Sequence, residues 1–169
     1  MNSRLYEFDL DHEPIFDPES TPILGFENHK FLSNFYLCNV VYKGLSFPST
    51  EHAYVWSKKF DNTKEWYDKV LSISHPGELK RFGYTVKLRK DWDSVKYTIM
   101  SEIVRCKFNQ NSHLTKLLLS TGNSYIEETN WWKDVYWGVC NGIGENNLGK
   151  ILMIIRKEFN DVQRNISTI

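Results

Sequence analysis

The segment from Asp91 to Phe108 limits the possible folds of this chain more than any other part of the sequence. Its apolar residues recur every three or four positions, which is the spacing that places side chains on one face of an α-helix. Asp91 precedes the pattern, where a side chain that caps a helix is expected. The pattern predicts a long amphipathic helix with one buried face. The residues on that face are Trp92, Val95, Ile99, Ile103 and Cys106.

Start and stop signals predict five further helices. A Ser or Thr before an acidic residue is typical of a helix start, and a Gly is typical of the position just after a helix end. Pro is also favoured in the first helical turn. The predicted helices are Thr50–Phe60, one starting near Asn62, one starting near Ser74 and ending at Gly83, Ser112–Ser120 before Gly122, and a last one with Leu148, Ile151, Leu152, Ile155 and Phe159 on one face.

Strand signals are few. Val40–Tyr42 and Leu45–Phe47 are rich in apolar residues and flank Lys43-Gly44, a pattern that predicts a β-hairpin. Tyr84–Leu88 is predicted to form another short strand. The chain is therefore expected to have an α+β fold that is predominantly helical, with a small β hairpin or sheet.

The chain length of 169 residues suits one compact domain with a sizeable core. Three of the five prolines fall within the first 24 residues, and prolines at this density favour an extended arm or an early strand over a helix. The sequence thus predicts an N-terminal extended arm at 1–24, the domain itself at 25–160, and a C-terminal tail at 161–169.

The charge balance argues against one class of partner. The chain has 21 basic and 21 acidic side chains and a formal net charge of zero. Proteins that bind nucleic acid through its phosphates usually carry a basic excess, so no strong non-specific nucleic-acid binding is expected. A local basic pocket for one or two phosphates remains compatible with this balance.

The cysteines and histidines show no metal-binding pattern. Cys38, Cys106 and Cys140 are far apart and form no C-x-x-C pair, and His52 and His75 lack partners at metal-ligand spacing, so no metal site is expected. The N-terminus has no signal-peptide pattern, and no apolar run approaches about 18 residues. These features predict a cytoplasmic protein without membrane contact.

The first candidate site combines the run Phe31–Tyr36 with the run Phe47–Tyr54. Glu51 falls in the first turn of its predicted helix, where the helix dipole favours an ionised carboxylate. Lys58 follows two turns later and shares the same helix face. A carboxylate and an ammonium on one face suit a charged sugar phosphate. The alternative is a glutamate that only stabilises its helix, beside a solvated lysine.

The second and third candidate stretches are basic and aromatic, respectively. The second holds Lys80-Arg81, Leu88–Asp93 and Lys107, which suit a phosphate or simply a solvated helix face around Trp92. The third is rich in carboxylates, indoles and glycines, and it suits either a nucleotide or sugar site or a surface loop with packed tryptophans. Its residues are Glu127-Glu128, Trp131-Trp132, Asp134, Tyr136-Trp137-Gly138 and Asn146-Asn147-Leu148-Gly149.

The third stretch also contains a pattern that imitates a phosphate-binding loop. Gly144 and Gly149-Lys150 have the glycine spacing of a P-loop, but Ile151 stands where that loop needs a hydroxyl for magnesium. A nucleoside triphosphatase of the P-loop type is therefore excluded.

Taken in order, these stretches resemble the NADAR family, whose bacterial members include the YbiA-like N-glycosidases. The resemblance covers about residues 24–160. Two positions depart from the family pattern, because Tyr84 stands where arginine is frequent and Val139–Asn141 replaces a more glycine-rich segment. The matching residues are the runs Phe31–Tyr36 and Phe47–Tyr54, Lys58, Leu88-Arg89, Asp91-Trp92, Met100, Lys107-Phe108, Thr121-Gly122, Glu127, Asp134, Trp137-Gly138, Asn146–Lys150 and Arg156.

The resemblance implies hydrolysis of the N-glycosidic bond between a phosphorylated ribose and an amino nitrogen. Some members of the family remove ADP-ribose from modified guanine in nucleic acid, and others cleave ribosylamino-pyrimidine phosphates of riboflavin synthesis. The first substrate is favoured here because the lysines and the wide aromatic loop suit a diphosphate. The expected partner is thus a phosphorylated ribosyl small molecule or an ADP-ribosylated guanine base, and no cofactor is needed.

The implied chemistry assigns roles to three carboxylates. Cleavage passes through an oxocarbenium-like state on the ribose. A nearby carboxylate stabilises this cation or activates the attacking water. Glu51 takes this role, and the helix terminus is expected to keep it ionised. Asp134 is the first candidate, and Glu127 the second, for assisting the leaving amine or positioning the ribose hydroxyls.

Other residues are expected to bind the substrate. Lys58 would neutralise the phosphate, and Trp92 and Trp137 would stack on the base or close the pocket. The remaining expected binding residues are Asn34, Phe35, Arg89, Gly138, Asn146 and Asn147.

Two other classes of function fit the same features. A non-catalytic module that binds ADP-ribose or a nucleotide would show the same aromatic, glycine and lysine residues, but it has no need for a carboxylate beside the sugar. A protein-interaction module would expose its tryptophans to dock a partner.

Overall fold

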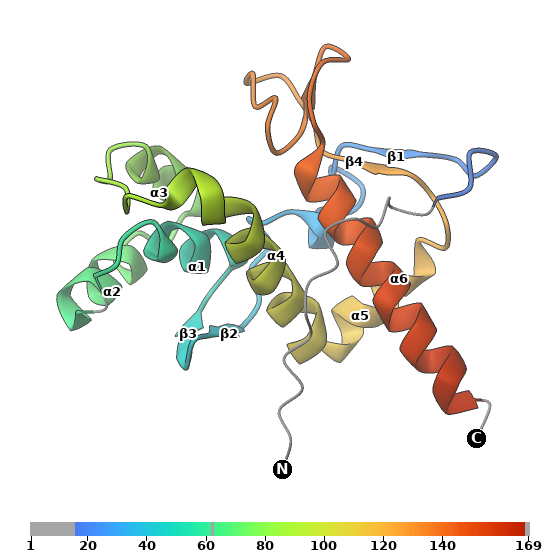
Figure 1. Ribbon diagram of the computed structural model, residues 1–169, viewed down its shortest axis with the longest axis horizontal. Coiled ribbons are helices and arrows are strands. Elements are labelled where there is room, and N and C mark those ends of the chain that lie inside the picture. The colour runs from blue at the N-terminus through green and yellow to red at the C-terminus, as the bar shows by residue number, and fades with distance from the viewer. Residues whose placement is uncertain (1–15, 62, 168–169) are drawn as a thin grey trace.

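The computed structural model describes residues 16–61 and 63–167. Within these residues the chain is predominantly helical, with short paired strands, and the expected α+β fold is confirmed (Figure 1). The helices are α1 (Thr50–Ser57), α2 (Lys64–Leu71), α3 (Pro76–Gly83), α4 (Trp92–Gln110), α5 (Ser112–Ser120) and α6 (Asn147–Ser167), with a 3-10 helix at Lys30–Leu32. The strands are β1 (Ile23–Leu24), β2 (Val40–Tyr42), β3 (Leu45–Phe47), β4 (Ile126–Glu127), β5 (Thr129–Asn130) and β6 (Val139–Cys140).

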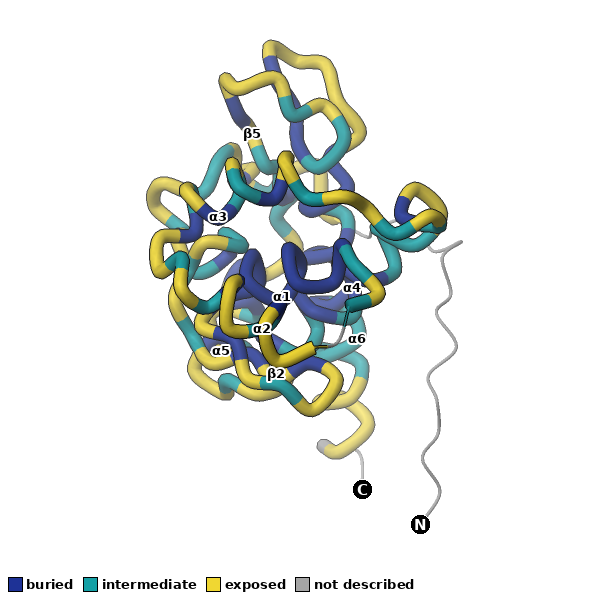
Figure 2. The backbone as a smooth tube through the Cα atoms, turned by 90° about the vertical axis from the view of Figure 1, so that its left-hand side faces the viewer, coloured by how far each residue is buried: buried dark blue, intermediate teal, exposed yellow. Residues whose placement is uncertain are grey.

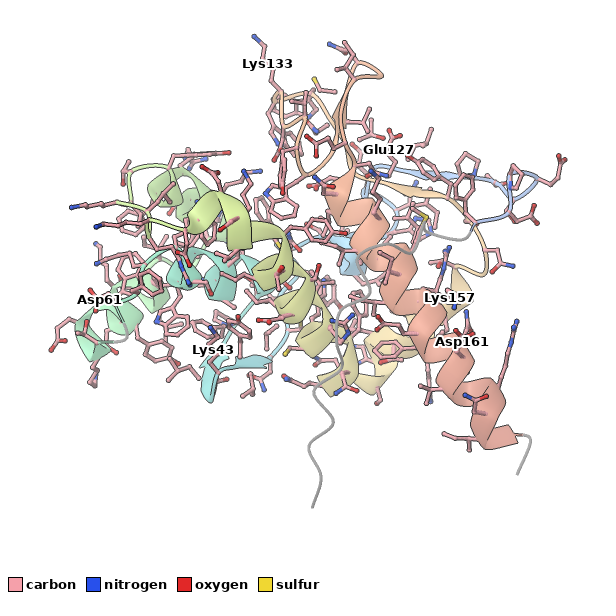
Figure 3. All side chains as sticks on the ribbon, viewed as in Figure 1. Lys43, Asp61, Glu127, Lys133, Lys157 and Asp161 are labelled. Atoms are coloured by element: carbon pink, nitrogen blue, oxygen red, sulfur yellow. The ribbon has the colours of Figure 1, made fainter. Side chains whose placement is uncertain are left out.

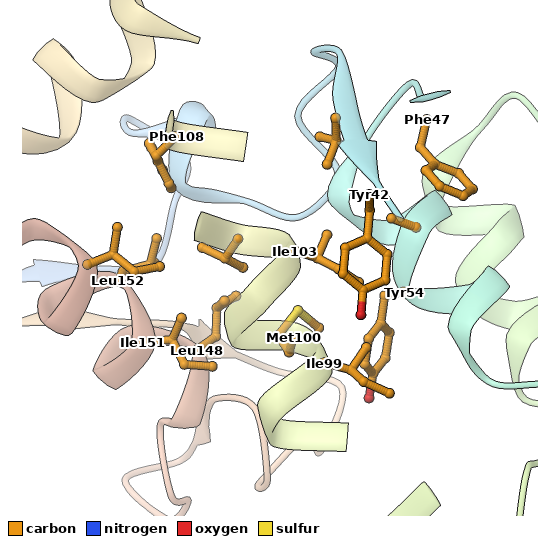
Figure 4. Close-up of a cluster of buried hydrophobic side chains, with 14 of the residues drawn as sticks. Tyr42, Phe47, Tyr54, Ile99, Met100, Ile103, Phe108, Leu148, Ile151 and Leu152 are labelled. Atoms are coloured by element: carbon orange, nitrogen blue, oxygen red, sulfur yellow. The ribbon is translucent and has the colours of Figure 1, made fainter. Parts of the chain in front are cut away.

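Helix α4 lies at the centre of the molecule and contacts β2, α1, α5 and α6. Figure 4 shows its side chains Ile99 and Ile103 between residues of α6, such as Leu148, and the aromatic side chains of Tyr42 and Tyr54. All five of these residues are buried. The long helix predicted from the apolar repeat is therefore confirmed, and α1, β2, α5 and α6 all pack on it.

The predicted helix starts are largely confirmed. Helix α1 begins at Thr50, where the Ser49 hydroxyl accepts a hydrogen bond from the backbone N–H of His52 at 3.3 Å. It ends at Ser57, three residues before the predicted end. Helix α2 begins at Lys64 with Thr63 as its cap, and Asn62, the predicted start, lies outside the described residues.

Asp91 precedes helix α4 without capping it. Its carboxylate does not bond to the helix N-terminus. Instead it pairs with the guanidinium of Arg89, at 2.6 and 2.8 Å. The expected capping role is therefore wrong, because a charged partner two residues earlier competes for the carboxylate.

The strands form three separate pairs. The predicted hairpin of β2 and β3 is confirmed, with Lys43 and Gly44 at positive φ in its turn. Two parallel pairs, β1 with β4 and β5 with β6, were not predicted. The strands of the first pair are distant in sequence and those of the second are separated by a loop, so no local pattern marks either pair.

The predicted strand at Tyr84–Leu88 is wrong. This segment forms a turn and irregular backbone, and it pairs with no strand of the described residues. Its side chains Tyr84 and Leu88 are exposed, at 70% and 45%. Without burial of its apolar side chains or backbone hydrogen bonds to a neighbouring strand, nothing stabilises a strand in this segment.

Both termini differ in part from the predicted boundaries. Residues 1–15 of the predicted N-terminal arm lie outside the described residues, and the rest of the arm includes β1. Helix α6 continues through Ser167, so residues 161–167 extend the last helix where a tail was expected. Of the described helices, none is both long and apolar enough to cross a membrane.

The segment between β4 and α6 forms a long loop that projects beyond the N-terminal end of α6 (Figure 1, orange). Its outer part is exposed, whereas α1 beneath it is buried (Figure 2). We name residues 128–146 the β4–α6 loop. The β5–β6 pair lies within it and ties its two ends together.

Close packing of α6 against β4 leads to a stability prediction. A Cβ atom on Gly149 would lie 2.2 Å from the carbonyl oxygen of Ile126. In an open helix, alanine is favoured over glycine by about 1 kcal/mol, but this clash reverses the sign. We expect Gly149→Ala to lower the free energy of unfolding by more than about 2 kcal/mol in urea titrations.

Lys150→Ala, at the next position of α6, is the matched control and should change the stability little. A Gly149→Ala protein as stable as the wild type would contradict the close contact between α6 and β4.

Candidate active site

A cavity of about 1210 Å³ opens between α1, α3, the start of α4 and the β4–α6 loop. The segment from Leu24 to Leu37 forms another part of its wall. The cavity therefore collects residues from all three stretches that the sequence singled out. Among its lining residues, those with charged side chains are Glu27, Lys30, Glu51, Lys58, Lys80, Lys96, Glu128, Lys133 and Asp134.

Glu51 lies in the first turn of α1 and lines the cavity. Its backbone N–H donates to the carbonyl oxygen of Asn34 at 3.0 Å, and its side chain is almost fully buried. Burial raises the pKa of Glu51 to about 7, although the charges of Lys80 and Lys58 oppose this shift. At neutral pH Glu51 is therefore only partly ionised, although its place at the helix terminus predicts a fully ionised carboxylate, because the loss of water outweighs the helix dipole.

Lys58 follows α1 directly and is 9% exposed. Its ammonium donates to the carbonyl oxygen of Gly83 at 2.9 Å and lies 5.7 Å from the ring of Tyr54. Burial lowers its pKa, and the charge of Glu51 works against that shift. Both residues thus share one site, and neither is the solvated side chain that the alternative interpretation requires.

Lys80 of α3 connects the cavity wall to the β4–α6 loop. Its ammonium lies 3.3 Å from a carboxylate oxygen of Asp134. Burial disfavours its charge, but Asp134 and Glu51 outweigh burial and raise the pKa of Lys80. The ammonium also faces the ring of Trp132 at 5.3 Å. Lys80 therefore stays charged at the point where both sides of the cavity meet.

Asp134 is held rigidly inside the loop. One carboxylate oxygen accepts the backbone N–H of Trp137 at 3.0 Å, and the other pairs with Lys80. The side chain of Asn130 bonds to both backbone groups of Asp134, at 2.8 and 3.1 Å. The structure thus brings Asp134 to the cavity, as the sequence predicts.

Glu128 lines the same cavity, and sequence reasoning missed it as a site residue. Its pKa is raised to about 8 by burial, with Lys80 opposing the shift and the charges of Asp134 and Glu51 adding to it. The preceding residue, Glu127, was chosen instead. Neighbouring residues in an extended segment point to opposite sides, so only one of the two faces the cavity.

Glu127, labelled in Figure 3, is the last residue of β4 and does not line the cavity. Its carboxylate accepts a hydrogen bond from the Thr129 hydroxyl at 2.7 Å, and another from the Tyr125 hydroxyl at 3.4 Å. Alternation of side chains along an extended segment could have shown that only one of the two glutamates faces the cavity. This signal is usable only once β4 is known to be a strand.

Aromatic rings form the floor and the rim of the cavity. On the floor, the ring centroid of Tyr54 lies 5.0 Å from that of Trp92 and 5.7 Å from that of Trp137. On the rim, Trp131 and Trp132 meet edge to face at 5.5 Å and are 84% and 45% exposed. Buried rings shape the site, whereas the exposed pair remains free to contact a ligand.

Asn34 and Phe35 line the cavity as predicted, whereas four other expected binding residues do not. Arg89 pairs with Asp91 and lies 3.9 Å from the ring centroid of Phe60. The side chain of Asn147 donates to Glu145 at 2.8 Å. The predicted residues found outside the cavity lining are Arg89, Gly138, Asn146 and Asn147.

Gly138 and Asn146 instead support Glu128 from behind. The side-chain oxygen of Asn146 accepts the backbone N–H of Glu128 at 3.1 Å. A Cβ atom on Gly138 would lie 2.1 Å from the carbonyl oxygen of Glu128. The glycine therefore permits the two backbone segments to approach.

Across the described part of the chain, no cluster of three or more histidine, cysteine or acidic side chains has an arrangement that could hold a metal ion. The cavity is lined by carboxyl and ammonium groups, of which Glu51 and Lys58 are buried and Lys80 and Asp134 are paired. Such groups support proton transfer and the binding of anions.

Comparison with known proteins identifies the family. A family model described as NADAR domain matches residues 19–160. The chain belongs to the NADAR domain family. The resemblance inferred from the ordered motifs is therefore confirmed.

Two named relatives are similar to this NADAR domain in sequence. The N-glycosidase YbiA of Escherichia coli is 35% identical over 130 residues, which cover 75% of this chain and 79% of that protein. A riboflavin biosynthesis protein of Vibrio vulnificus is 39% identical over 138 residues, which cover 80% of this chain. This chain spans only 37% of the length of the Vibrio protein.

A solved structure supports the same relationship. The NMR structure of the Escherichia coli protein YbiA matches this NADAR domain with a TM-score of 0.74 at 30% sequence identity, covering 85% of this chain and 87% of that one. The chain is thus an enzyme of the N-glycosidase class, a hydrolase acting on N-glycosyl bonds.

The burial of Glu51 makes the stability of the protein depend on pH. Folding raises its pKa from 4.5 to about 7, so the folded state holds the proton more tightly than the unfolded state. The resulting stabilisation is fully present below the unfolded pKa and is lost as the pH rises through the folded pKa. Glu51→Gln cannot ionise, so it should melt near the wild-type temperature at about pH 5 but above it at about pH 8.5.

Differential scanning calorimetry at both pH values measures the effect, and each kcal/mol should move Tm by roughly 2–4 °C. A difference between the two proteins that is the same at both pH values would contradict the raised pKa of Glu51.

Proposed function

We propose that this chain hydrolyses the N-glycosidic bond between a phosphorylated ribose and the amino nitrogen of a heterocyclic base. The observation that carries the proposal is the position of Glu51. This carboxyl is buried in a cavity that Lys58, Lys80 and several aromatic rings also line, and both ammoniums act on it electrostatically. Cleavage of a phosphorylated ribosyl base requires a carboxylate near the developing cation, ammoniums that bind the phosphate, and flat aromatic surfaces on which the base stacks.

Glu51 meets the ribose in this mechanism. Loss of the base leaves positive charge on the anomeric carbon and the ring oxygen, and an ionised carboxylate nearby stabilises that charge. With a pKa of about 7, Glu51 is partly ionised at neutral pH and can take a proton from the attacking water. Its backbone bond to Asn34 keeps the first turn of α1 in place.

Lys58 binds the phosphate. An ammonium has three donors, and the hydrogen bond to Gly83 accounts for one. The other two remain for phosphate oxygens. Partial burial strengthens this contact, because less water screens the two charges.

Asp134 positions the ribose hydroxyls. Its two oxygens already accept bonds from Lys80 and from the N–H of Trp137, so the carboxylate is fixed in one orientation. Each oxygen can accept a further bond, and ribose hydroxyls are suitable donors.

ADP-ribosylated guanine is the substrate that fits the cavity best. Typical small-molecule pockets measure roughly 300–1,000 Å³. The cavity, at about 1210 Å³, therefore has room for two bases and a diphosphate. The exposed Trp131 and Trp132 at the rim offer a surface on which a second base can stack. With zero net charge, the protein would recognise the adduct itself rather than a long stretch of nucleic-acid backbone.

A second candidate substrate follows from the relatives. The Vibrio vulnificus relative and a chloroplastic relative from Zea mays are named riboflavin biosynthesis proteins. A ribosylamino-pyrimidine phosphate of riboflavin synthesis carries one phosphate and one ring, and it would occupy the inner part of the cavity beside Glu51 and Lys58.

A product assay tests the proposal. The protein is incubated with ADP-ribosylated guanosine, with an oligonucleotide that carries the same adduct, and with ribosylamino-pyrimidine phosphates, and the released sugar is identified by mass. We expect ADP-ribose from both modified substrates, at rates that change little with salt because few flanking phosphates are bound.

Each other outcome of this assay has a distinct meaning. Release of ribose 5-phosphate from the pyrimidines alone would favour the second candidate. Tight binding of ADP-ribose without release of any sugar would contradict the enzymatic proposal and support a binding module.

Removal of the Glu51 carboxylate tests its role. Glu51→Gln keeps the side-chain volume but cannot stabilise the cation or accept a proton. We expect kcat to fall by at least about 10²-fold, while ADP-ribose still binds. The measurement is steady-state hydrolysis with parallel calorimetric titration of ADP-ribose. Turnover near the wild-type rate in this variant would remove Glu51 from the mechanism.

A further inference from the structure

We infer that Glu128 is the catalytic residue that donates a proton to the leaving nitrogen, on the opposite side of the glycosidic bond from Glu51. The inference rests on the proposed function, since it assigns the second half of the same reaction. Three observations carry it: the place of Glu128 in the cavity, the burial of its carboxyl oxygen Oε2, and the bonding state of the other carboxyls.

Glu128 reaches the cavity from the β4–α6 loop, whereas Glu51 reaches it from α1. Two elements of different origin thus present one carboxyl each to the same space. One oxygen of Glu128, Oε2, is buried and has no hydrogen-bond partner among the described residues. A buried polar atom without a partner costs free energy, so it is expected where a ligand supplies the missing bond.

The backbone around Glu128 is fixed from both sides. Its N–H donates to the side chain of Asn146 at 3.1 Å, and its carbonyl oxygen accepts the N–H of Val139 at 2.9 Å. Asn146 also donates to the carbonyl oxygen of Ile126 at 2.9 Å, so it braces the end of β4 as well. With its backbone held in this way, the carboxyl of Glu128 needs little reorganisation to meet a substrate.

Asn146 and Gly138 therefore act as positioning residues for Glu128. The sequence drew attention to both as residues of a binding loop. Their contacts show a different use, because Asn146 bonds to the backbone of Glu128 and Gly138 leaves room for its carbonyl oxygen. They act through Glu128 and not on the substrate.

The neighbouring carboxyls already have hydrogen-bond partners. Asp134 accepts hydrogen bonds at both oxygens, from Lys80 and from the N–H of Trp137. Glu127 lies outside the cavity and accepts bonds from Thr129 and Tyr125. Among these three acidic residues, only Glu128 has a buried oxygen left free.

Loss of water around the carboxyl of Glu128 favours its protonated form at neutral pH. Burial raises its pKa to about 8, and the carboxylates of Asp134 and Glu51 add to this effect, against the opposing charge of Lys80. Two carboxyls of one site are thereby separated in role, since the lower pKa belongs to Glu51. Such a separation is how paired carboxyls divide into an acid and a base.

The step balances as follows. The carboxyl proton of Glu128 moves to the glycosidic nitrogen while the bond between that nitrogen and the anomeric carbon breaks, and the bonding electron pair stays on the nitrogen. Water then adds to the anomeric carbon and gives one proton to the Glu51 carboxylate. The products are the free amine and the free sugar. Proton exchange with solvent returns both carboxyls to their starting states.

The test is the Glu128→Gln variant, which keeps the volume of the side chain but has no acidic proton. We expect kcat to fall by at least about 10²-fold with ADP-ribosylated guanosine, while the affinity for ADP-ribose changes little. In the wild type, kcat should rise with pH as Glu51 ionises and fall again as Glu128 loses its proton. The variant should keep the rise and lose the fall at alkaline pH.

Two further variants serve as rescue and control. Glu128→Asp retains an acidic proton on a shorter side chain, so it should recover part of the rate and the alkaline fall. Glu127→Gln removes the adjacent carboxylate, which lies outside the cavity, and should keep the wild-type rate and pH profile.

The outcomes separate this inference from the proposed function. If the wild type releases sugar and Glu128→Gln matches its rate or its alkaline fall, the assignment of Glu128 is overturned and the proposed function stands. If the wild type releases no sugar from any of the three substrates, the proposed function and this inference both fail. A Glu127→Gln protein as slow as Glu128→Gln would also overturn the assignment, since the effect would then belong to the loop and not to one carboxyl.

Discussion

The site depends on the packing of α4 against both α1 and α6. On one side α4 contacts α1, which carries Glu51, and on the other it contacts α6, which continues the loop that carries Glu128. The buried side chains Ile99 and Ile103 hold these neighbours at a fixed separation (Figure 4). A change in the α4 core would therefore alter the distance between two acidic groups that belong to different elements.

Loss of water is the second constraint, and it sets the protonation of the site. The helix terminus favours an ionised Glu51 by about 0.3–1 kcal/mol. A pKa that moves from 4.5 to about 7 corresponds to roughly 3 kcal/mol in the other direction. Burial therefore decides, and it acts in the same direction on Glu128. Lys80 keeps these shifts moderate, because its charge favours the ionised forms of both carboxyls.

Two residues of the β4–α6 loop, Gly138 and Asn146, have a structural role where their sequence context predicts contact with a ligand. Gly138 and Asn146 stand in a glycine- and amide-rich stretch, which is typical of direct ligand contact. In the fold they hold the backbone of Glu128, and the residues of this loop region that line the cavity include Glu128 and Asp134. Residues of such a loop are needed for the site even when they do not touch what it binds.

The sequence by itself determined the local elements and the family. The apolar repeat predicted α4, the Lys43-Gly44 turn predicted the hairpin, and the ordered motifs identified the NADAR domain, because each of these signals lies in neighbouring residues. Only the tertiary structure decided which glutamate of the pair Glu127-Glu128 faces the cavity. That choice depends on the parallel pairing of β4 with β1, and the protonation of the site depends on how much water packing removes. Both are properties of contacts between distant segments, which no local pattern contains.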